Sequence, residues 1–169
     1  GYISDRHRAT WETYQVYHEA HQWKQADREL QILEKMSDEE WSQRATRQRA
    51  WVYHHRMGRF DEAIKLYISL ADPPWTLWQI QDCHWRLKNR KKAMSVLAEL
   101  ETMFPDYAAR AAWRRTEYLE DMGEKDSAIA SARRIMKKYP KSQQSSHAHQ
   151  FLEKYGVETG LRQTDEHGF

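Results

Sequence analysis

The sequence is poor in the residues that interrupt helices or cross-link a fold. Its 169 residues include one cysteine, Cys83, four prolines and six glycines. A single cysteine excludes a disulfide within the chain. No uninterrupted apolar run approaches the roughly 20 residues that a membrane-spanning helix needs. The chain therefore has neither a disulfide framework nor the sequence pattern of a membrane span.

The patterns that predict strands and common catalytic sites are also missing. There is no sustained alternation of β-branched residues, and neither Asn-Gly nor Asp-Gly occurs. A glycine-rich phosphate loop and a Gly-x-Ser-x-Gly motif are absent, and the surroundings of Cys83 are not those of a nucleophile. We therefore expect an all-α protein that is not an enzyme and has no cofactor.

Charge is abundant but nearly balanced, with 27 Lys and Arg against 25 Asp and Glu. The resulting net charge of +2 is too small to indicate a nucleic acid partner by itself. Hydrophobic residues make up 40% of the chain, which is typical of a folded domain. The unusual feature is the presence of eight tryptophans and nine tyrosines, large rings that either fill a core or line a binding surface.

A helix-sized pattern built around an alanine occurs four times. The alanines are Ala26, Ala63, Ala93 and Ala128. The residues four and seven positions after them are Leu30 and Leu33, Tyr67 and Leu70, Leu97 and Leu100, and Ala132 and Ile135. This spacing places the three positions of each copy on one face of a helix. Such a recurrence predicts a repeat protein made of helix pairs.

Turn and cap signals give the expected limits of these pairs. Gly58 and Gly123 are expected between paired helices, where glycine tolerates a left-handed turn. Ser37 and Glu40 form a capping box that is expected to begin a helix. The predicted pairs cover residues 5–36, 38–71, 75–103 and 107–138, followed by a capping helix at 143–155 and a flexible tail at 156–169.

The pattern resembles the tetratricopeptide repeat (TPR), a helix-turn-helix unit of about 34 residues. The alanines match the small residues of that family, and Pro105 and Pro140 match its terminal proline and are expected to end helices. The resemblance implies an all-α TPR-like α-solenoid, a right-handed superhelix of four helix pairs with a C-terminal capping helix. Residues 1–155 would form this single repeat domain.

The resemblance covers roughly residues 8–155, with one systematic departure. The usual small residue of the first helix is replaced, copy by copy, by Tyr14, Trp51, Gln81 and Thr116. The ends of the third and fourth copies are similar to TPR proteins of bacterial envelope assembly. The sequence does not decide between the cytoplasm and a bacterial periplasm.

In TPR proteins the first helix of each pair lines the concave face, so the resemblance implies a groove that binds a peptide or helix of another protein. The predicted binding residues are Trp11, His55, Arg56, Trp75, Trp78, Asp82, Trp85, Arg86, Trp113 and Glu117. Further residues expected on this face include Gln15, His18, Glu19, Gln48 and Glu120. Tryptophan and arginine suit an interface because each contributes about 2 kcal/mol or more at a binding hot spot. The implied function is that of an assembly scaffold.

Three alternatives remain open at this point. A tryptophan stripe at helical spacing also fits core packing, which is the role expected for Trp23 and Trp51. The basic cluster from Arg86 to Lys92 would suit an anion or a single-stranded nucleic acid. The same groove would also suit self-association as a structural subunit. No metal site is expected, because the histidine pairs 18/21 and 147/149 lack a third close ligand.

Overall fold

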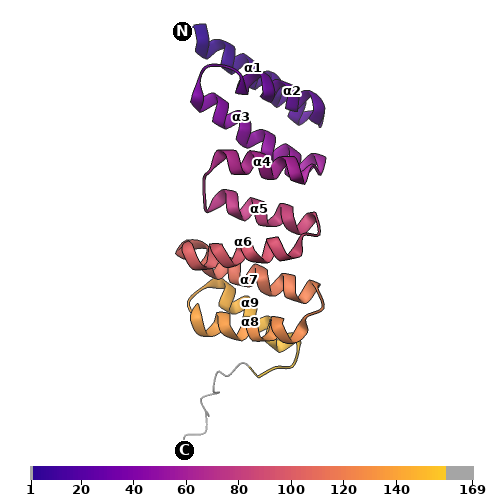
Figure 1. Cartoon of the computed structure of the whole chain (residues 1–169), viewed down its shortest axis with the longest axis vertical. Helices are drawn as coiled ribbons and strands as arrows, with labels where there is room; N and C mark the ends of the chain where they lie inside the picture. The colour runs from indigo at the N-terminus through magenta and orange to yellow at the C-terminus, as the bar shows by residue number, and fades with distance from the viewer. Residues whose placement is uncertain (1, 159–169) are drawn as a thin grey trace, which may run out of the picture. The chain divides into compact units, whose positions relative to one another are not determined.

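The computed structural model describes residues 2–158, and the predicted tail lies largely outside them, at 159–169. The described residues form nine α-helices and one π-helical segment, and none of them forms a strand (Figure 1). The elements are α1 (Tyr2–Glu19), α2 (Trp23–Glu34), α3 (Glu39–Val52), η1 (Tyr53–Met57), α4 (Phe60–Leu70), α5 (Trp75–Arg86), α6 (Arg90–Met103), α7 (Pro105–Asp121), α8 (Lys125–Lys138) and α9 (Gln143–Lys154). The all-α prediction is confirmed. Among these helices, none is both long and apolar enough to cross a membrane.

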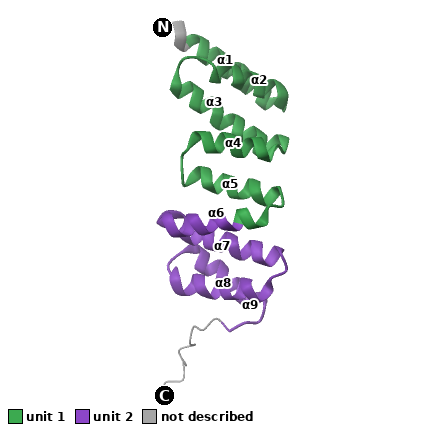
Figure 2. Cartoon of the chain, in the orientation of Figure 1, with its two compact units in different colours: residues 1–93 green, residues 94–169 purple. Residues whose placement is uncertain are grey.

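The chain divides into two compact units, and the division falls within α6 (Figure 2). Unit 1 covers residues 1–93 and unit 2 covers residues 94–169. In unit 1, each helix from α1 to α5 packs against the next one along the chain. In unit 2, α7 packs against α8, and α9 packs against both. The prediction of a single domain over residues 1–155 stays a prediction.

The recurring alanines lie in the cores of these units. Ala26, Ala63, Ala93 and Ala128 are all completely buried. The residues four positions later are equally buried, as are three of the four residues seven positions later. The exception, Leu70, is half-buried because it is the last residue of α4. Alanine at these points lets neighbouring helices approach closely, and the predicted packing face is confirmed.

Larger residues occupy the buried face of the first helices. Tyr14, Gln81 and Thr116 are buried, at positions where a small residue is usual in the family that the sequence resembles. Their polar atoms are accommodated by local bonds: the Thr116 hydroxyl, for example, lies 2.7 Å from Ser131 Oγ on α8. Buried polar groups are tolerated when they are paired in this way.

The turns between helices follow the glycine signals. Gly58 and Gly123 have φ angles of 65° and 78°, in the left-handed region that glycine tolerates without strain. In the connection between α5 and α6, where glycine is missing, Lys88 takes φ 61°. The prediction of turns at Gly58 and Gly123 is confirmed.

Two predicted helix limits are wrong. Asp38, not Ser37, caps α3, because its Oδ1 accepts from the Trp41 backbone N–H at 3.0 Å. The helix α6 ends at Met103, just before Pro105, as predicted, but Pro105 also begins α7, two residues earlier than the predicted limit at residue 107. Proline is well suited to the first turn of a helix, since the N–H that it lacks would have no partner inside the helix there.

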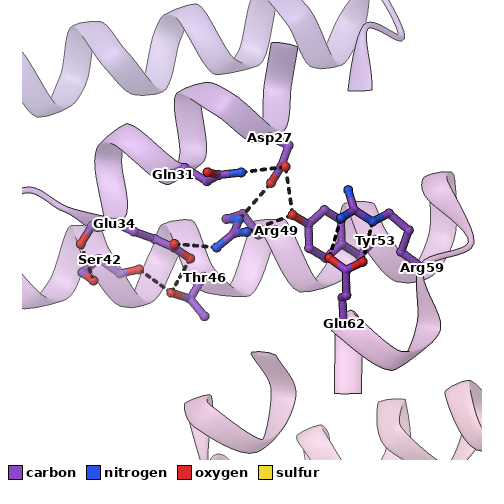
Figure 3. Close-up of polar contacts among 9 residues, drawn as sticks. All are labelled: Asp27, Gln31, Glu34, Ser42, Thr46, Arg49, Tyr53, Arg59 and Glu62. Carbon is purple, nitrogen blue, oxygen red and sulfur yellow. Dashed lines mark hydrogen bonds and ion pairs between the residues drawn. The ribbon is translucent and has the colours of Figure 1, made fainter. Parts of the chain in front are cut away.

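A buried ionic network joins α2 to α3 and η1 (Figure 3). The Arg49 Nε donates to Asp27 Oδ1 at 2.9 Å, and Nη1 donates to Glu34 Oε2 at 2.6 Å. The Tyr53 hydroxyl accepts from Arg49 Nη2 and donates to Asp27 Oδ2. Burial alone would lower the pKa of Arg49, but hydrogen bonds to Asp27 and Tyr53 and the charge of Glu34 raise it. The guanidinium therefore stays charged and fixes these helices together.

Candidate functional site

Unit 1 contains a pocket of about 210 Å³ between α1 and α3. It is lined by Trp11, Tyr14, Gln15, His18, Glu19 and Gln48. Five of these six residues belong to the face that the sequence predicts for partner contacts, and Tyr14 is the addition. The i, i+4 and i+7 spacing of Trp11, Gln15 and His18 along α1 places them on one side of that helix.

Hydrogen bonds fix the floor of the unit 1 pocket. The Tyr14 hydroxyl donates to Gln48 Oε1 at 3.1 Å and lies 3.0 Å from His18 Nδ1. Because that hydroxyl gives its only proton to Gln48, it can accept from a protonated His18 Nδ1. Burial raises the pKa of Tyr14 to about 12, so the phenol stays neutral at physiological pH. The pocket therefore combines an indole wall with a set of fixed amide and hydroxyl groups.

The Trp11 indole is held by contacts with two other rings and one cation. Its ring centroid lies 5.0 Å from that of Tyr14 and 6.0 Å from that of Trp41. The Arg44 guanidinium lies 4.3 Å from the Trp11 ring centroid and 5.1 Å from that of Trp41. These contacts hold the indole in one orientation while leaving it half-buried.

The expectation that Trp23 and Trp51 belong to the core is wrong. Both are half-buried, and polar side chains cover them. Arg56 lies over both rings, at 5.4 Å from Trp23 and 5.2 Å from Trp51. The His18 ring stacks on Trp51, with 5.5 Å between the ring centroids. The His55 ring also contacts Trp51, with a centroid distance of 5.2 Å. The predicted binding residues His55 and Arg56 therefore form part of an aromatic and cationic cluster in unit 1.

All eight tryptophans, which all fall within the described residues, are half-buried. The buried core consists instead of alanine, leucine, tyrosine and a few other residues. Every indole consequently keeps part of its surface in contact with solvent. Covering that surface would be favourable, at about 25 cal/mol for each Å² of apolar area removed from water.

Two predicted site residues on α5 are engaged in a buried relay. Asp82 Oδ2 lies 2.6 Å from His54 Nε2 and 3.3 Å from Arg86 Nε. On the other side of the imidazole, His54 Nδ1 lies 2.9 Å from the Tyr67 hydroxyl. The His54 side chain is only 1% exposed, so no solute reaches it. The relay orients groups of η1, α4 and α5 within unit 1.

The remaining predicted residues of α5 are tryptophans, and two of them, Trp75 and Trp85, have a nearby cation. Trp75 contacts Tyr67 edge to face at 5.6 Å, and Arg47 lies over its ring at 4.4 Å. Trp78 and Trp85 are half-buried, and Arg90 lies 5.4 Å from the Trp85 ring centroid. Two cations of the basic cluster at residues 86–92 are therefore already engaged, Arg86 with Asp82 and Arg90 with Trp85.

Unit 2 contains a larger pocket, of about 400 Å³, between α7 and α9. Its lining residues are Trp113, Glu117, Glu120, His147, Gln150, Phe151 and Lys154. The first three lie on α7, on the face that the sequence predicts for partner contacts. The four from α9 were missed, because that helix was interpreted only as a cap over an apolar end. The sequence contained only a weak signal for them. Positions 147, 150, 151 and 154 carry polar and aromatic residues, and their spacing of three and four places them on one helix face.

Rings form one side of the unit 2 pocket. The Trp113 ring centroid lies 6.1 Å from that of Phe151, edge to face, and 5.7 Å from that of His147. Phe151 is buried in the core of unit 2, and Trp113 packs against the same core. The aromatic side of the pocket is therefore rigid.

Two carboxylates of α7 also line this pocket, and their environments differ. Glu120 Oε2 accepts from the Tyr155 hydroxyl at 2.6 Å and from Lys154 Nζ at 3.1 Å. The Tyr155 hydrogen bond is the main reason that the pKa of Glu120 is lowered. The pKa of Glu117 is raised, first by burial and then by the charges of Asp121 and Glu120, against the opposing effect of Arg114. Glu120 thus has a cation within hydrogen-bond distance, whereas the Arg114 Nε lies 3.8 Å from Glu117 Oε1.

Metal-binding geometry does not emerge from these side chains. Within residues 2–158, no group of three or more His, Cys, Asp and Glu residues is placed to hold a metal ion. His147 lines the unit 2 pocket, whereas His149 Nδ1 lies 3.4 Å from Glu153 Oε1.

One comparison with known proteins gives a match. Residues 110–142 match the family model described as tetratricopeptide repeat. This segment runs from within α7 through α8 to the residue before α9 and includes Ala128. No curated protein matches the chain.

Proposed function

Since the chain is a TPR-like helical repeat protein, we propose that it is a scaffold that binds a segment of another protein. TPR repeats generally mediate protein–protein interaction. In this proposal, α1 to α8 form four helix pairs of a right-handed superhelix and α9 caps the last pair. The partner, an extended peptide or a helix, contacts the first helices of the pairs.

The observation that carries the proposal is the position of the two pockets. The unit 1 pocket contains Trp11 and the unit 2 pocket contains Trp113, and both tryptophans are among the binding residues that the resemblance to TPR proteins implies. Each pocket combines a half-buried indole with several polar groups. Binding pockets have this composition, because the ring supplies apolar contact area and the polar groups select the ligand.

A scaffold role also fits the burial of the side chains that could otherwise react, Cys83 and His54. Cys83 is buried, and burial raises the pKa of its thiol to about 12, so it is protonated at neutral pH and not nucleophilic. The Tyr67–His54–Asp82 relay resembles a catalytic arrangement in composition, but the imidazole is enclosed. These groups support packing and not catalysis.

The proposal is tested by partner capture followed by a binding measurement. Proteins retained by the wild-type chain are identified by mass spectrometry, purified, and titrated against variants by calorimetry. Gln15→Arg and Gln150→Arg place a bulky side chain at exposed pocket positions without altering the core. Each is expected to weaken binding by about tenfold or more, as loss of a hot spot would.

Matched controls are available on exposed apolar positions outside both pockets. Ile68 and Met103 are 62% and 63% exposed, and Ile68→Ala and Met103→Ala are expected to leave affinity unchanged. If a purified partner bound all four variants with wild-type affinity, the pockets would have no role and the proposal would be wrong.

A further inference from the structure

The unit 2 pocket contains groups that together favour a positively charged ligand. Glu117 and Glu120 lie on α7, and the Trp113 and Phe151 rings face the same space. Carboxylates attract a cation, and the face of an aromatic ring stabilises it through the ring quadrupole. A guanidinium suits this combination best, because it is planar, stacks on indole and bonds carboxylates through two N–H groups.

The pocket already contains one cation held in this manner. Lys154 Nζ lies 3.1 Å from Glu120 Oε2, 5.9 Å from the Phe151 ring centroid and 5.0 Å from that of Tyr155. An ammonium between a carboxylate and aromatic rings is therefore a stable arrangement at this site. Glu117 and Trp113 provide the same pairing of carboxylate and ring in the other part of the pocket.

Glu117 is compensated less closely than Glu120, by the charges of Arg114 and His147. The Arg114 Nε lies 3.8 Å from its Oε1, beyond hydrogen-bond distance. Asp121 and Glu120 add negative charge nearby, and burial further penalises the ionised form. A cation placed beside this carboxylate would relieve both effects.

The His147 ring also lines this pocket, but its Nδ1 is buried and is not presented to a ligand. The exposed amide of Gln150 lies on the same wall. The pocket therefore offers acceptors for several N–H groups. A guanidinium has five such groups in a fixed plane, whereas an ammonium has three.

We propose that the pocket between α7 and α9 recognises an arginine side chain of the partner, with the guanidinium stacked on Trp113 and bonded to Glu117. This inference rests on the proposed function and specifies the chemistry of the partner at one of its two pockets. It predicts that the segment bound by unit 2 carries an arginine. The partner's own carboxylates are excluded from this position by Glu117 and Glu120.

The test uses two short peptides and the full chain. Acetyl-Gly-Arg-Gly-amide is titrated into the ¹⁵N-labelled protein, and its citrulline counterpart, which is neutral but nearly the same shape, serves as the matched ligand. The indole N–H signal of Trp113 is assigned by its disappearance in Trp113→Phe. The arginine peptide is expected to shift this signal, and the citrulline peptide to bind about tenfold more weakly, because the charge-assisted bonds are lost.

Two protein variants complete the design. Glu117→Gln is expected to reduce the arginine effect by about tenfold, as loss of a charge-assisted contact does. Glu124→Gln, an exposed acidic position just beyond α7 that does not line the pocket, is expected to change nothing. Because the two peptides are compared on the wild-type protein, only the assignment of the Trp113 signal requires a folded variant, and Trp113→Phe keeps an aromatic ring against the core.

Equal shifts with arginine and citrulline, or no shift at Trp113 with either peptide, would overturn the inference. Those results would leave the proposed function standing if a captured partner still loses affinity in Gln15→Arg or Gln150→Arg. Conversely, a shift with arginine in a protein whose partner ignores both pocket variants would establish the subsite and refute the scaffold proposal.

Discussion

Arg49 of α3 and Asp27 of α2 form a buried ion pair, with 2.9 Å between Arg49 Nε and Asp27 Oδ1. Their side chains are only 15% and 9% exposed, and the same guanidinium also pairs with Glu34 (Figure 3). One guanidinium thus pairs with two carboxylates that are largely buried. The pair is therefore a point where unit 1 is sensitive to a single change.

Arg49→Met is expected to destabilise the protein by about 3–5 kcal/mol, because it leaves Asp27 and Glu34 buried without their cation. Arg47→Met is the matched control, since its ion pair with Asp72 is 41% and 55% exposed and contributes at most about 1 kcal/mol. Urea unfolding followed by circular dichroism measures both. Similar losses in the two variants would show that the Arg49 network does not stabilise unit 1.

The stability of unit 2 is expected to depend on pH through Glu101. Burial alone would raise the pKa of this carboxyl, but hydrogen bonds from Arg134 and Tyr139 and the charges of Arg134 and Lys138 lower it below its usual value near 4.5. A lowered pKa in the folded state stabilises the fold above the unfolded-state value, and that contribution is lost as the pH falls through the folded-state pKa.

The measurement is the free energy of unfolding between pH 6 and pH 3 for the wild-type chain and Glu101→Gln. The wild-type chain should lose stability below about pH 4.5, and the variant should be less stable at pH 6 but show a flatter decline. Parallel curves for the two proteins would contradict the assignment of this pH dependence to Glu101.

Glu117→Gln is expected to separate stability from binding. The pKa of Glu117 is raised in the folded state, so its ionised form costs stability above the unfolded-state pKa, and a neutral amide removes that cost. Because the side chain is 42% exposed, solvent screening limits the gain to about 0.5 kcal/mol or less. Thermal unfolding should show equal or slightly higher stability, while affinity for an arginine ligand falls. A clear loss of stability would mean that Glu117 has a structural role instead.

Cys83 should be unreactive in the folded protein. Its thiol is buried and its pKa is raised to about 12 by burial, so the thiolate is scarce at pH 8. A colorimetric thiol reagent should label it slowly in buffer and fully in denaturant. Rapid labelling in buffer would reveal an open route to this residue and weaken the argument that it only packs.

Much of the fold was predictable because close helix packing has a strict sequence pattern. The alanine spacing identified buried positions such as Ala63 and Tyr67, and Gly58 and Gly123 marked left-handed turns. The predicted start at residue 107 is two residues late, because Pro105 follows the end of α6 and is also the first residue of α7. The π-helical turn at Tyr53–Met57 has no sequence signal of its own.

The candidate site was predictable only in part. The resemblance to TPR proteins implies that Trp11 and Trp113 face a partner, but it does not show which other helix completes a pocket there. The contribution of α9 through His147 and Phe151 depends on tertiary packing. The hydrogen bond between Asp82 and His54 likewise joins residues that are 28 positions apart, so no local spacing rule predicts it.

The most direct test of the central claim is the affinity of a captured partner for the wild-type chain, Gln15→Arg, Gln150→Arg and the Ile68→Ala control, measured by calorimetry. A scaffold that uses its tryptophan pockets predicts about tenfold weaker binding for at least one pocket variant and unchanged binding for the control. Unchanged affinity in both pocket variants would contradict it.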